Sequence, residues 1–215
     1  MLKRIREYNM LVGFYGVWTI VTYLAVVSGS IGIYFGLQGR TDIALICLML
    51  SALCDAIDGT IARACKKRTE KEKDYGRQLD SLCDTVSFIF LPIAIFYGLG
   101  YTNWYNILIY TLYTLAGVIR LAYFNVIAEK TSVGAVKTYS GMPVPVTAVI
   151  FPLVYLIKHS VIPETFHVIY TYTMLMIAVL FVLNFKIKKP KNTYIFIFLA
   201  FAVILTIIIL YIGKR

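Results

Sequence analysis

Residues 54–84 read CDAIDGTIARACKKRTEKEKDYGRQLDSLCD, and four aspartates in apolar surroundings constrain how this stretch folds. On helices, the i,i+3 spacing of Asp55 and Asp58 and the i,i+4 spacing of Asp80 and Asp84 place each pair on one face. Carboxylates within a membrane usually face an internal polar site, because lipid contact is costly. Four anions in one site also need compensating charge. One or two hard divalent ions bound by oxygen ligands would supply it most simply.

The composition predicts an all-α membrane protein. The 215 residues are 60% hydrophobic and only 15% charged, and apolar runs of about 20 residues recur along the chain. The net charge is +10, but most Lys and Arg lie between apolar runs, which indicates membrane orientation and not a nucleic-acid partner. The N-terminal residues show no cleavage pattern of a signal peptide. The four cysteines lack C-x-x-C spacing and are expected to pack as small apolar residues.

We expect residues 1–215 to form a single polytopic helix bundle with about six to seven transmembrane helices. Residues 1–9 are expected to form an interfacial helix, 10–185 the core spans and 193–213 an additional C-terminal span. Gly29, Gly32 and Gly36 would allow close helix packing in the first span. The candidate spans are 10–37, 43–65, 76–99, 104–128, 142–159, 165–185 and 193–213.

Connections rich in Lys and Arg alternate along the chain with connections that carry few or none. This alternation predicts the orientation of the chain in the membrane. By this pattern the N-terminus and the 66–74 connection are cytoplasmic, and the C-terminus is outside, although Lys214 and Arg215 oppose this weakly. The basic connections contain Lys3, Arg4 and Arg6; Lys66, Lys67, Arg68, Lys71 and Lys73; Lys130 and Lys137; and Lys186, Lys188, Lys189 and Lys191.

This orientation places both aspartate pairs in the cytoplasmic half of a cell membrane. Asp55 and Asp58 would lie roughly 10–15 Å from the inner end of their span, and Asp80 and Asp84 roughly 6–12 Å, at 1.5 Å per residue. The two pairs should therefore meet in a site that faces the cytoplasm. The charge run KKRTEKEKD, residues 66–74, is expected to be a solvated loop.

The order of these residues resembles the signature of the CDP-alcohol phosphotransferase family. The matching pattern is Asp55-x-x-Asp58-Gly59-x-x-Ala62-Arg63, then Gly76-x-x-x-Asp80-x-x-x-Asp84. One departure is that twelve residues separate Arg63 from Gly76, more than many members carry. The extra residues fall in the charged connection, so they affect its conformation more than the chemistry.

The resemblance implies a role for each matched residue. Asp55, Asp58 and Asp80 would be the principal ligands of Mg²⁺ or Mn²⁺, with two ions expected. Asp84 would be the general base and could share in metal binding. The CDP-linked lipid would contact Asp58, Gly59, Ala62, Arg63 and Gly76. The chemistry of the residues agrees, because glycine leaves room for a nucleotide and arginine can pair with phosphate in bidentate fashion.

Two later stretches resemble the phosphatidylserine synthase branch of this family. They are Arg120-Leu-Ala-Tyr-Phe-Asn125 and Gly141-Met-Pro-Val-Pro145, and Asp80-Ser-Leu-Cys-Asp84-Thr-Val-Ser-Phe88 is similar as well. The branch implies transfer of a phosphatidyl group from CDP-diacylglycerol to L-serine, giving phosphatidylserine and CMP. Arg120 is a candidate to bind the serine carboxylate, with Asn125 and Lys137 as further candidates for the acceptor site.

The sequence leaves alternatives open. Another acceptor, such as inositol phosphate, glycerol phosphate or an amino alcohol, would use the same chemistry. A phosphorylated acceptor should require several convergent cations, and Arg120 is the clear intramembrane cation after the third span. A cation or proton transporter could also use an aspartate cluster, but Gly59 and Arg63 would then be unexplained. The donor could carry an archaeol backbone, and small-residue faces permit a homodimer.

Overall fold

The computed structural model describes residues 13–65, 68–130 and 138–188, together with positions 201, 204, 205 and 207–209. A six-residue π-helical segment, η1 (Thr85–Phe90), joins α3 to α4 without a break, and two short 3₁₀ turns, η2 (Val144–Val146) and η3 (Lys158–Ser160), flank α6. The α-helices are α1 (Val17–Leu37), α2 (Thr41–Ala64), α3 (Glu70–Asp84), α4 (Leu91–Gly98), α5 (Trp104–Lys130), α6 (Thr147–Ile157) and α7 (Pro163–Val182).

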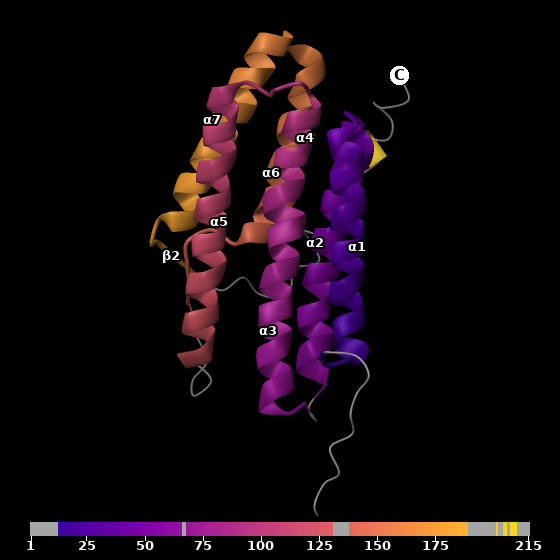
Figure 1. The fold of residues 1–215 in the computed structure, drawn as a ribbon, viewed down its shortest axis with the longest axis vertical. Helices are drawn as coiled ribbons and strands as arrows, with labels where there is room; N and C mark the ends of the chain where they lie inside the picture. Colours follow the sequence, from indigo (N-terminus) through magenta and orange to yellow (C-terminus); the bar gives the residue numbers. More distant parts are fainter. Residues whose placement is uncertain are drawn as a thin grey trace, which may run out of the picture.

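The expected polytopic helix bundle is confirmed. Five stretches are long and apolar enough to cross a membrane, and α3, η1 and α4 together form one of them. The long helices lie roughly parallel in a bundle, with α1 and α2 side by side next to the continuous α3–η1–α4 rod (Figure 1). The five stretches are Val17–Leu37, Thr41–Ala62, Glu70–Gly98, Trp104–Ile127 and Pro163–Val182.

The remaining expected spans have different outcomes. The predicted span 142–159 is a shorter apolar helix, Val144–Ile157, which at 1.5 Å per residue extends about 20 Å, less than the roughly 30 Å of a hydrocarbon core. The predicted interfacial helix, residues 1–9, lies outside the described residues. So does most of the predicted span 193–213, although Leu205 and Ile209 are helical and buried against the core.

The charged connection is more ordered than expected, and the loop prediction is wrong for residues 70–74. α3 begins at Glu70, and Thr69 caps it. The Glu72 backbone N–H donates to Thr69 Oγ1 at 3.3 Å, while the Thr69 backbone N–H donates to Glu72 Oε2 at 2.6 Å. This reciprocal capping box satisfies two backbone donors that a helix start would otherwise leave without partners. The T-x-x-E spacing in the sequence carries this signal.

α1 packs closely against its neighbours because small residues line the contact. A Cβ atom at Gly32 would lie 2.8 Å from the Cβ of Cys47 on α2 and 2.8 Å from a methyl group of Leu91 on α4, so a larger residue would push the helices apart. Two serines bond across the same contact. Ser28 donates to the Cys47 carbonyl at 2.9 Å, and Ser51 donates to the Ala25 carbonyl at 3.0 Å.

Two three-residue strands, which the sequence analysis did not predict, connect the segment before α6 to the end of α7. β1 (Thr138–Ser140) pairs antiparallel with β2 (Lys186–Lys188), with Tyr139 opposite Ile187. The Gly141 backbone N–H continues this pairing by donating to the Phe185 carbonyl at 2.6 Å. The segment 138–141, which precedes α6, is therefore held against the end of α7.

Candidate active site

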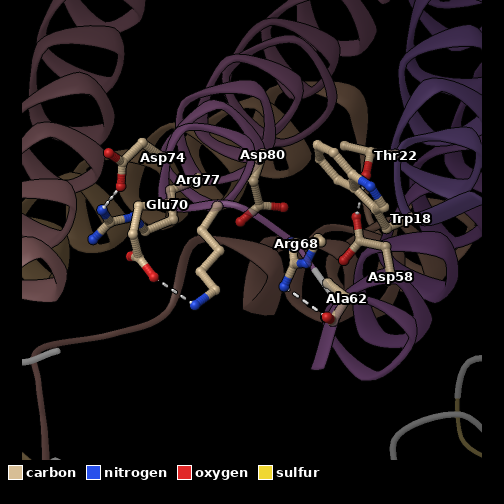
Figure 2. A pocket seen from close by; sticks show the side chains of 12 residues that line it. Trp18, Thr22, Asp58, Ala62, Arg68, Glu70, Asp74, Arg77 and Asp80 are labelled. Carbon is tan, nitrogen blue, oxygen red and sulfur yellow. Dashed lines mark hydrogen bonds and ion pairs between the residues drawn. The ribbon is translucent and has the colours of Figure 1, made fainter. Parts of the chain in front are cut away.

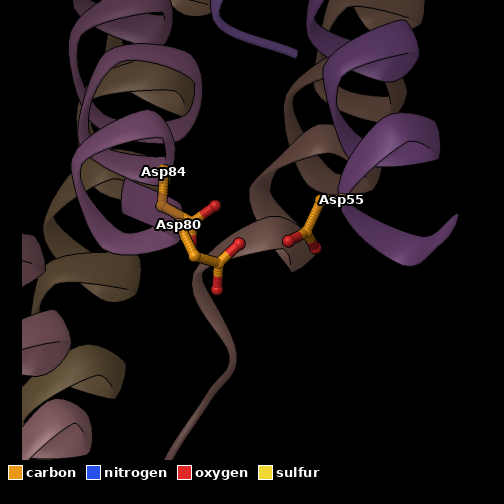
Figure 3. Close-up of side chains that lie close together, drawn as sticks. All are labelled: Asp55, Asp80 and Asp84. Carbon is orange, nitrogen blue, oxygen red and sulfur yellow. The ribbon is translucent and has the colours of Figure 1, made fainter. Parts of the chain in front are cut away.

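Three of the four motif aspartates meet between two helices. Asp55 lies on α2, whereas Asp80 and Asp84 lie one turn apart on α3, and their carboxylates point toward one another (Figure 3). One carboxylate oxygen of each residue lies within 4.8 Å of an oxygen of the other two. One member of the first pair, Asp55, thus meets both members of the second pair, whereas Asp58 does not belong to this cluster.

The donor set of this triad suits a hard divalent cation. In the part of the chain that the structure describes, none of the three carboxylates forms an ion pair with Lys or Arg. Asp84 is only 8% exposed, so solvent does little to offset its charge. Three converging carboxylates in an apolar bundle repel one another unless a cation lies between them. Their oxygens are the ligands that Mg²⁺, Mn²⁺ and Ca²⁺ prefer, so the triad could hold a metal ion.

A cavity of about 670 Å³ opens beside the triad. It lies among α1, α2 and α3, and the side chains of Asp58 and Asp80 point into it from two of these helices (Figure 2). Its volume is in the range of ligand pockets. The lining residues are Trp18, Thr22, Asp58, Gly59, Ala62, Arg68, Glu70, Lys73, Asp74, Gly76, Arg77 and Asp80.

Four of the five residues expected to contact a CDP-linked lipid line this cavity: Asp58, Gly59, Ala62 and Gly76. The side chain of the fifth, Arg63, lies outside the described residues. Asp58 is 7% exposed and its Oδ2 accepts a hydrogen bond from Thr22 Oγ1 at 2.9 Å. This contact from α1 helps fix the carboxylate at the cavity wall.

Seven lining residues lie outside the motif, and the sequence analysis did not expect them at the site: Trp18, Thr22, Arg68, Glu70, Lys73, Asp74 and Arg77. The Arg68 guanidinium lies 5.2 Å from the centre of the Trp18 ring and donates to the Ala62 carbonyl at 2.6 Å. Its Nε is buried with no hydrogen-bond partner among the described residues. The sequence gives little signal for these contacts, because α1 contributes to the cavity only through its tertiary packing.

The two acceptor candidates within the described residues, Arg120 and Asn125, are not among the residues that line this cavity. Asn125 on α5 bridges to α3, where its Oδ1 accepts from Ser81 Oγ at 2.9 Å and its Nδ2 donates to Gln78 Oε1 at 3.2 Å. Ser81 directly follows Asp80, so this bridge fixes α5 beside the helix that carries two of the triad aspartates. Lys137 lies outside the described residues.

Arg120 is buried at 5% exposure and held by backbone carbonyls. Its Nε donates to the Met142 carbonyl at 3.0 Å and its Nη2 to the Gly141 carbonyl at 3.1 Å, while the guanidinium carbon lies 3.5 Å from the centre of the Phe124 ring. Gly141 has a φ of +70° and no space for a Cβ beside the Leu183 carbonyl, so glycine suits this position.

Within the described ranges, the hydrogen-bond and ring partners of Arg120 are neutral, and Arg120 borders a second cavity of about 180 Å³. The cavity is lined by Ile119, Arg120, Tyr123, Phe181, Val182, Leu183 and Asn184. A buried cation with neutral partners attracts an anion, and a guanidinium binds carboxylates in bidentate fashion. The site is thus suited to a small anionic group.

Comparison with known proteins agrees with the motif. A family profile described as CDP-alcohol phosphatidyltransferase matches residues 17–212. The chain belongs to this family. The match extends well beyond α2 and α3, which carry the motif, and covers the described helices from α1 to α7.

Several curated relatives of this CDP-alcohol phosphatidyltransferase chain are named as serine transferases. An archaetidylserine synthase of Methanothermobacter thermautotrophicus is 33% identical over 64% of this chain and 56% of its own length. A CDP-diacylglycerol–serine O-phosphatidyltransferase of Saccharomyces cerevisiae is 31% identical over 72% of this chain and 54% of its own. One from Methanocaldococcus jannaschii is 28% identical over 83% and 77%. The chain thus spans about half the length of the first two relatives.

We predict that Asp55→Asn and Asp80→Asn each weaken divalent-ion binding by about tenfold or more, because each change removes a charged ligand, and even the loss of an outer contact to a ligand costs that much. The measurement is the Mn²⁺ concentration that gives half-maximal thermal protection of the purified protein. Asp42→Asn, at the opposite end of α2, is the matched control and should retain wild-type Mn²⁺ affinity. Equal Mn²⁺ affinity in all three variants would contradict a metal site at the triad.

Proposed function

We propose that this protein transfers the phosphatidyl group of CDP-diacylglycerol to L-serine, giving phosphatidylserine and CMP. The observation that carries the proposal is the carboxylate triad beside a cavity lined by five motif residues. Membership in the CDP-alcohol phosphatidyltransferase family supports the reaction class. The relatives named as serine transferases support the acceptor.

The cytidine diphosphate is proposed to bind in the 670 Å³ cavity. Gly59 and Gly76 leave space at its walls, where a nucleotide can approach two helices closely. Arg63, one helical turn from Gly59, would pair with the diphosphate. The diacyl chains would extend into the bilayer, and by the positive-inside pattern the cavity would open to the cytoplasm.

Asp55, Asp58 and Asp80 are the proposed ligands of two divalent ions, Mg²⁺ or Mn²⁺, with Asp84 close enough to share in binding. When bound, such ions offset the negative charge of the diphosphate and stabilise the CMP leaving group. The protein's own part is to hold these carboxylates close together at the interface of α2 and α3. Thr22, through its hydrogen bond to Asp58, helps orient one of them.

Asp84 is the proposed general base. The serine hydroxyl oxygen attacks the lipid-side phosphorus, and its proton passes to the Asp84 carboxylate. A phosphorus–oxygen bond forms to serine, while the bond from that phosphorus to the bridging oxygen breaks and CMP leaves with that oxygen. Asp84 suits this role because it lies one turn beyond Asp80 and is buried next to the other carboxylates.

Arg120 is the proposed partner of the serine carboxylate. Its guanidinium is buried, its hydrogen bonds among the described residues go to neutral carbonyls, and it borders a cavity of about 180 Å³, large enough for a small amino acid. Asn125 and Lys137 remain candidates for further acceptor contacts. Asn125 lies on the same helix as Arg120, and its hydrogen bonds hold this helix, α5, against α3 beside Asp80.

A donor with an archaeol backbone is the second candidate, since one relative is named an archaetidylserine synthase. The acceptor chemistry would be the same, because the reacting diphosphate does not include the lipid chains. The two donors are therefore distinguished by measuring CMP release from each of them with the same set of acceptors.

An acceptor panel tests the proposed function. Purified protein with Mg²⁺ or Mn²⁺ should release CMP from CDP-diacylglycerol or CDP-archaeol when L-serine is present. Release should be much slower with inositol phosphate or glycerol phosphate, because these acceptors need more cations than Arg120 provides. Fastest release with a phosphorylated acceptor would overturn the serine assignment, and no release with any acceptor would overturn the reaction.

We predict that Arg120→Ala raises the apparent KM for serine by about tenfold or more, because a hydrogen bond to a charged group contributes about 1.5–3 kcal/mol. The KM for the CDP-lipid should change little. Arg120→Lys, which keeps the charge but loses the bidentate geometry, should have an intermediate effect. Arg40→Ala, an exposed change at the start of α2, is the control. A rise in the KM for the CDP-lipid alone would assign Arg120 to the donor site instead.

Asp84→Asn should retain CDP-lipid binding but slow phosphatidyl transfer by about 10²-fold or more, the usual contribution of a positioned base. Asparagine keeps the shape of the side chain but cannot accept the serine proton. The measurements are CDP-lipid affinity and single-turnover CMP release for the same variant. Near-normal transfer together with weakened donor binding would instead make Asp84 a metal ligand and not the base.

A further inference from the structure

The helix that carries Asp80 and Asp84 changes its winding immediately after Asp84. Residues Thr85–Phe90 form the π-helical segment η1, and the Leu91 backbone N–H donates to the Val86 carbonyl, five residues earlier. Pro92 follows at the start of α4 and has no N–H to donate. The Phe88 carbonyl, four residues before it, therefore cannot receive the hydrogen bond that a regular α-helix would provide.

Tyr113 on α5 supplies a donor to that carbonyl. Its hydroxyl donates to the Phe88 carbonyl oxygen at 2.8 Å. The side chain is fully buried, with its ring centre 6.1 Å from that of Phe151 and 5.8 Å from that of Phe181. No water can easily replace this donor in the interior of a membrane bundle, where an unsatisfied backbone group is costly.

The η1 segment is also held from the side of α1. Ser87 Oγ donates to the Ala25 carbonyl at 3.4 Å, which also accepts from Ser51. Gly29 on α1 allows this approach, since a Cβ there would lie 2.6 Å from Ser87 Oγ. The segment is thus fixed between α1 and α5, and Tyr113 provides its contact to α5 through the backbone.

The winding of η1 determines which way Asp80 and Asp84 point. A π turn contains about one residue more than an α turn, which rotates the preceding helix by about 100° relative to the following one. α4 is fixed in the core through Leu91, Ile95 and Phe96. The face of α3 that meets Asp55 therefore depends on η1 keeping its π winding.

We propose that Tyr113 is a positioning residue that maintains the winding of η1 and thereby directs Asp80 and Asp84 toward Asp55. The inference rests on the proposed roles of these aspartates. It predicts that removal of the Tyr113 hydroxyl group alone disturbs metal binding and turnover, although this group is not in contact with the triad. Tyr113→Phe makes this change with the ring retained.

Tyr170→Phe is the matched control. Tyr170 is equally buried, and its hydroxyl donates at 3.3 Å to the Pro92 carbonyl, which lies beyond η1. Each variant loses one buried hydroxyl that bonds to a backbone carbonyl of the same helical rod. A general loss of packing or stability should affect the two variants similarly.

The experiment compares both variants with the wild type for kcat, the KM of the CDP-lipid, the unfolding temperature and the Mn²⁺ concentration that gives half-maximal thermal protection. In Tyr113→Phe we expect kcat to fall about tenfold and the Mn²⁺ concentration to rise severalfold, with the KM of the CDP-lipid within about twofold of wild type. Tyr170→Phe should keep wild-type kcat and Mn²⁺ affinity, even if its unfolding temperature falls as much.

Equal kcat and Mn²⁺ effects in the two variants, or none in Tyr113→Phe, would overturn the positioning role. The Mn²⁺ measurement needs no substrate, so it decides the question even if the wild type is inactive with serine. Normal Mn²⁺ protection with no CMP release would reject the proposed function while leaving the test of Tyr113 valid. No Mn²⁺ protection of the wild type would contradict the metal site, and the proposal for Tyr113 with it.

Discussion

The close approach of three carboxylates between α2 and α3 is the constraint on which the rest of this structure depends. Asp55, Asp80 and Asp84 lie within an apolar bundle, with oxygens at most 4.8 Å apart and no Lys or Arg paired with them in the described ranges. When all three carboxylates are ionised, such an arrangement needs a cation to offset their charge. The two helices must therefore be held at a fixed separation and rotation, whether or not substrate is bound.

Hydrogen bonds from side-chain hydroxyl groups help to hold the helices in this arrangement. Ser28 and Ser51 bond between α1 and α2, while Tyr113 and Tyr170 donate to carbonyls of the α3–η1–α4 rod from α5 and α7. In a membrane bundle the lipid offers little hydrophobic gain from helix association, so close packing and such hydrogen bonds determine which faces meet. The two ion pairs found among the described residues, in contrast, link exposed side chains near the start of α3.

The first three helices bring together the carboxylate triad and the cavity of about 670 Å³. The triad is shared by α2 and α3, whereas the cavity beside it also needs α1, which contributes Trp18 and Thr22. Asp80 belongs to both regions, whereas Asp58 lines the cavity and lies outside the triad. A ligand in the cavity would thus lie next to any ion at the triad, as a metal-dependent transfer from a diphosphate requires.

The sequence by itself determined the helical class, most of the spans and the four aspartates from which the triad is drawn, because apolar length and buried charge are local properties of the chain. It did not determine that Asp84, in place of Asp58, joins Asp55 and Asp80 in the cluster. It also contained the T-x-x-E capping box that extends α3 to Glu70, although the charge run there favoured a loop. Only the tertiary structure decided the carbonyl partners of Arg120, the cavity contacts of Trp18 and Arg68, and the hydroxyl that bonds to the π segment. These depend on which helix faces meet, and no local pattern specifies the rotation of one helix against another.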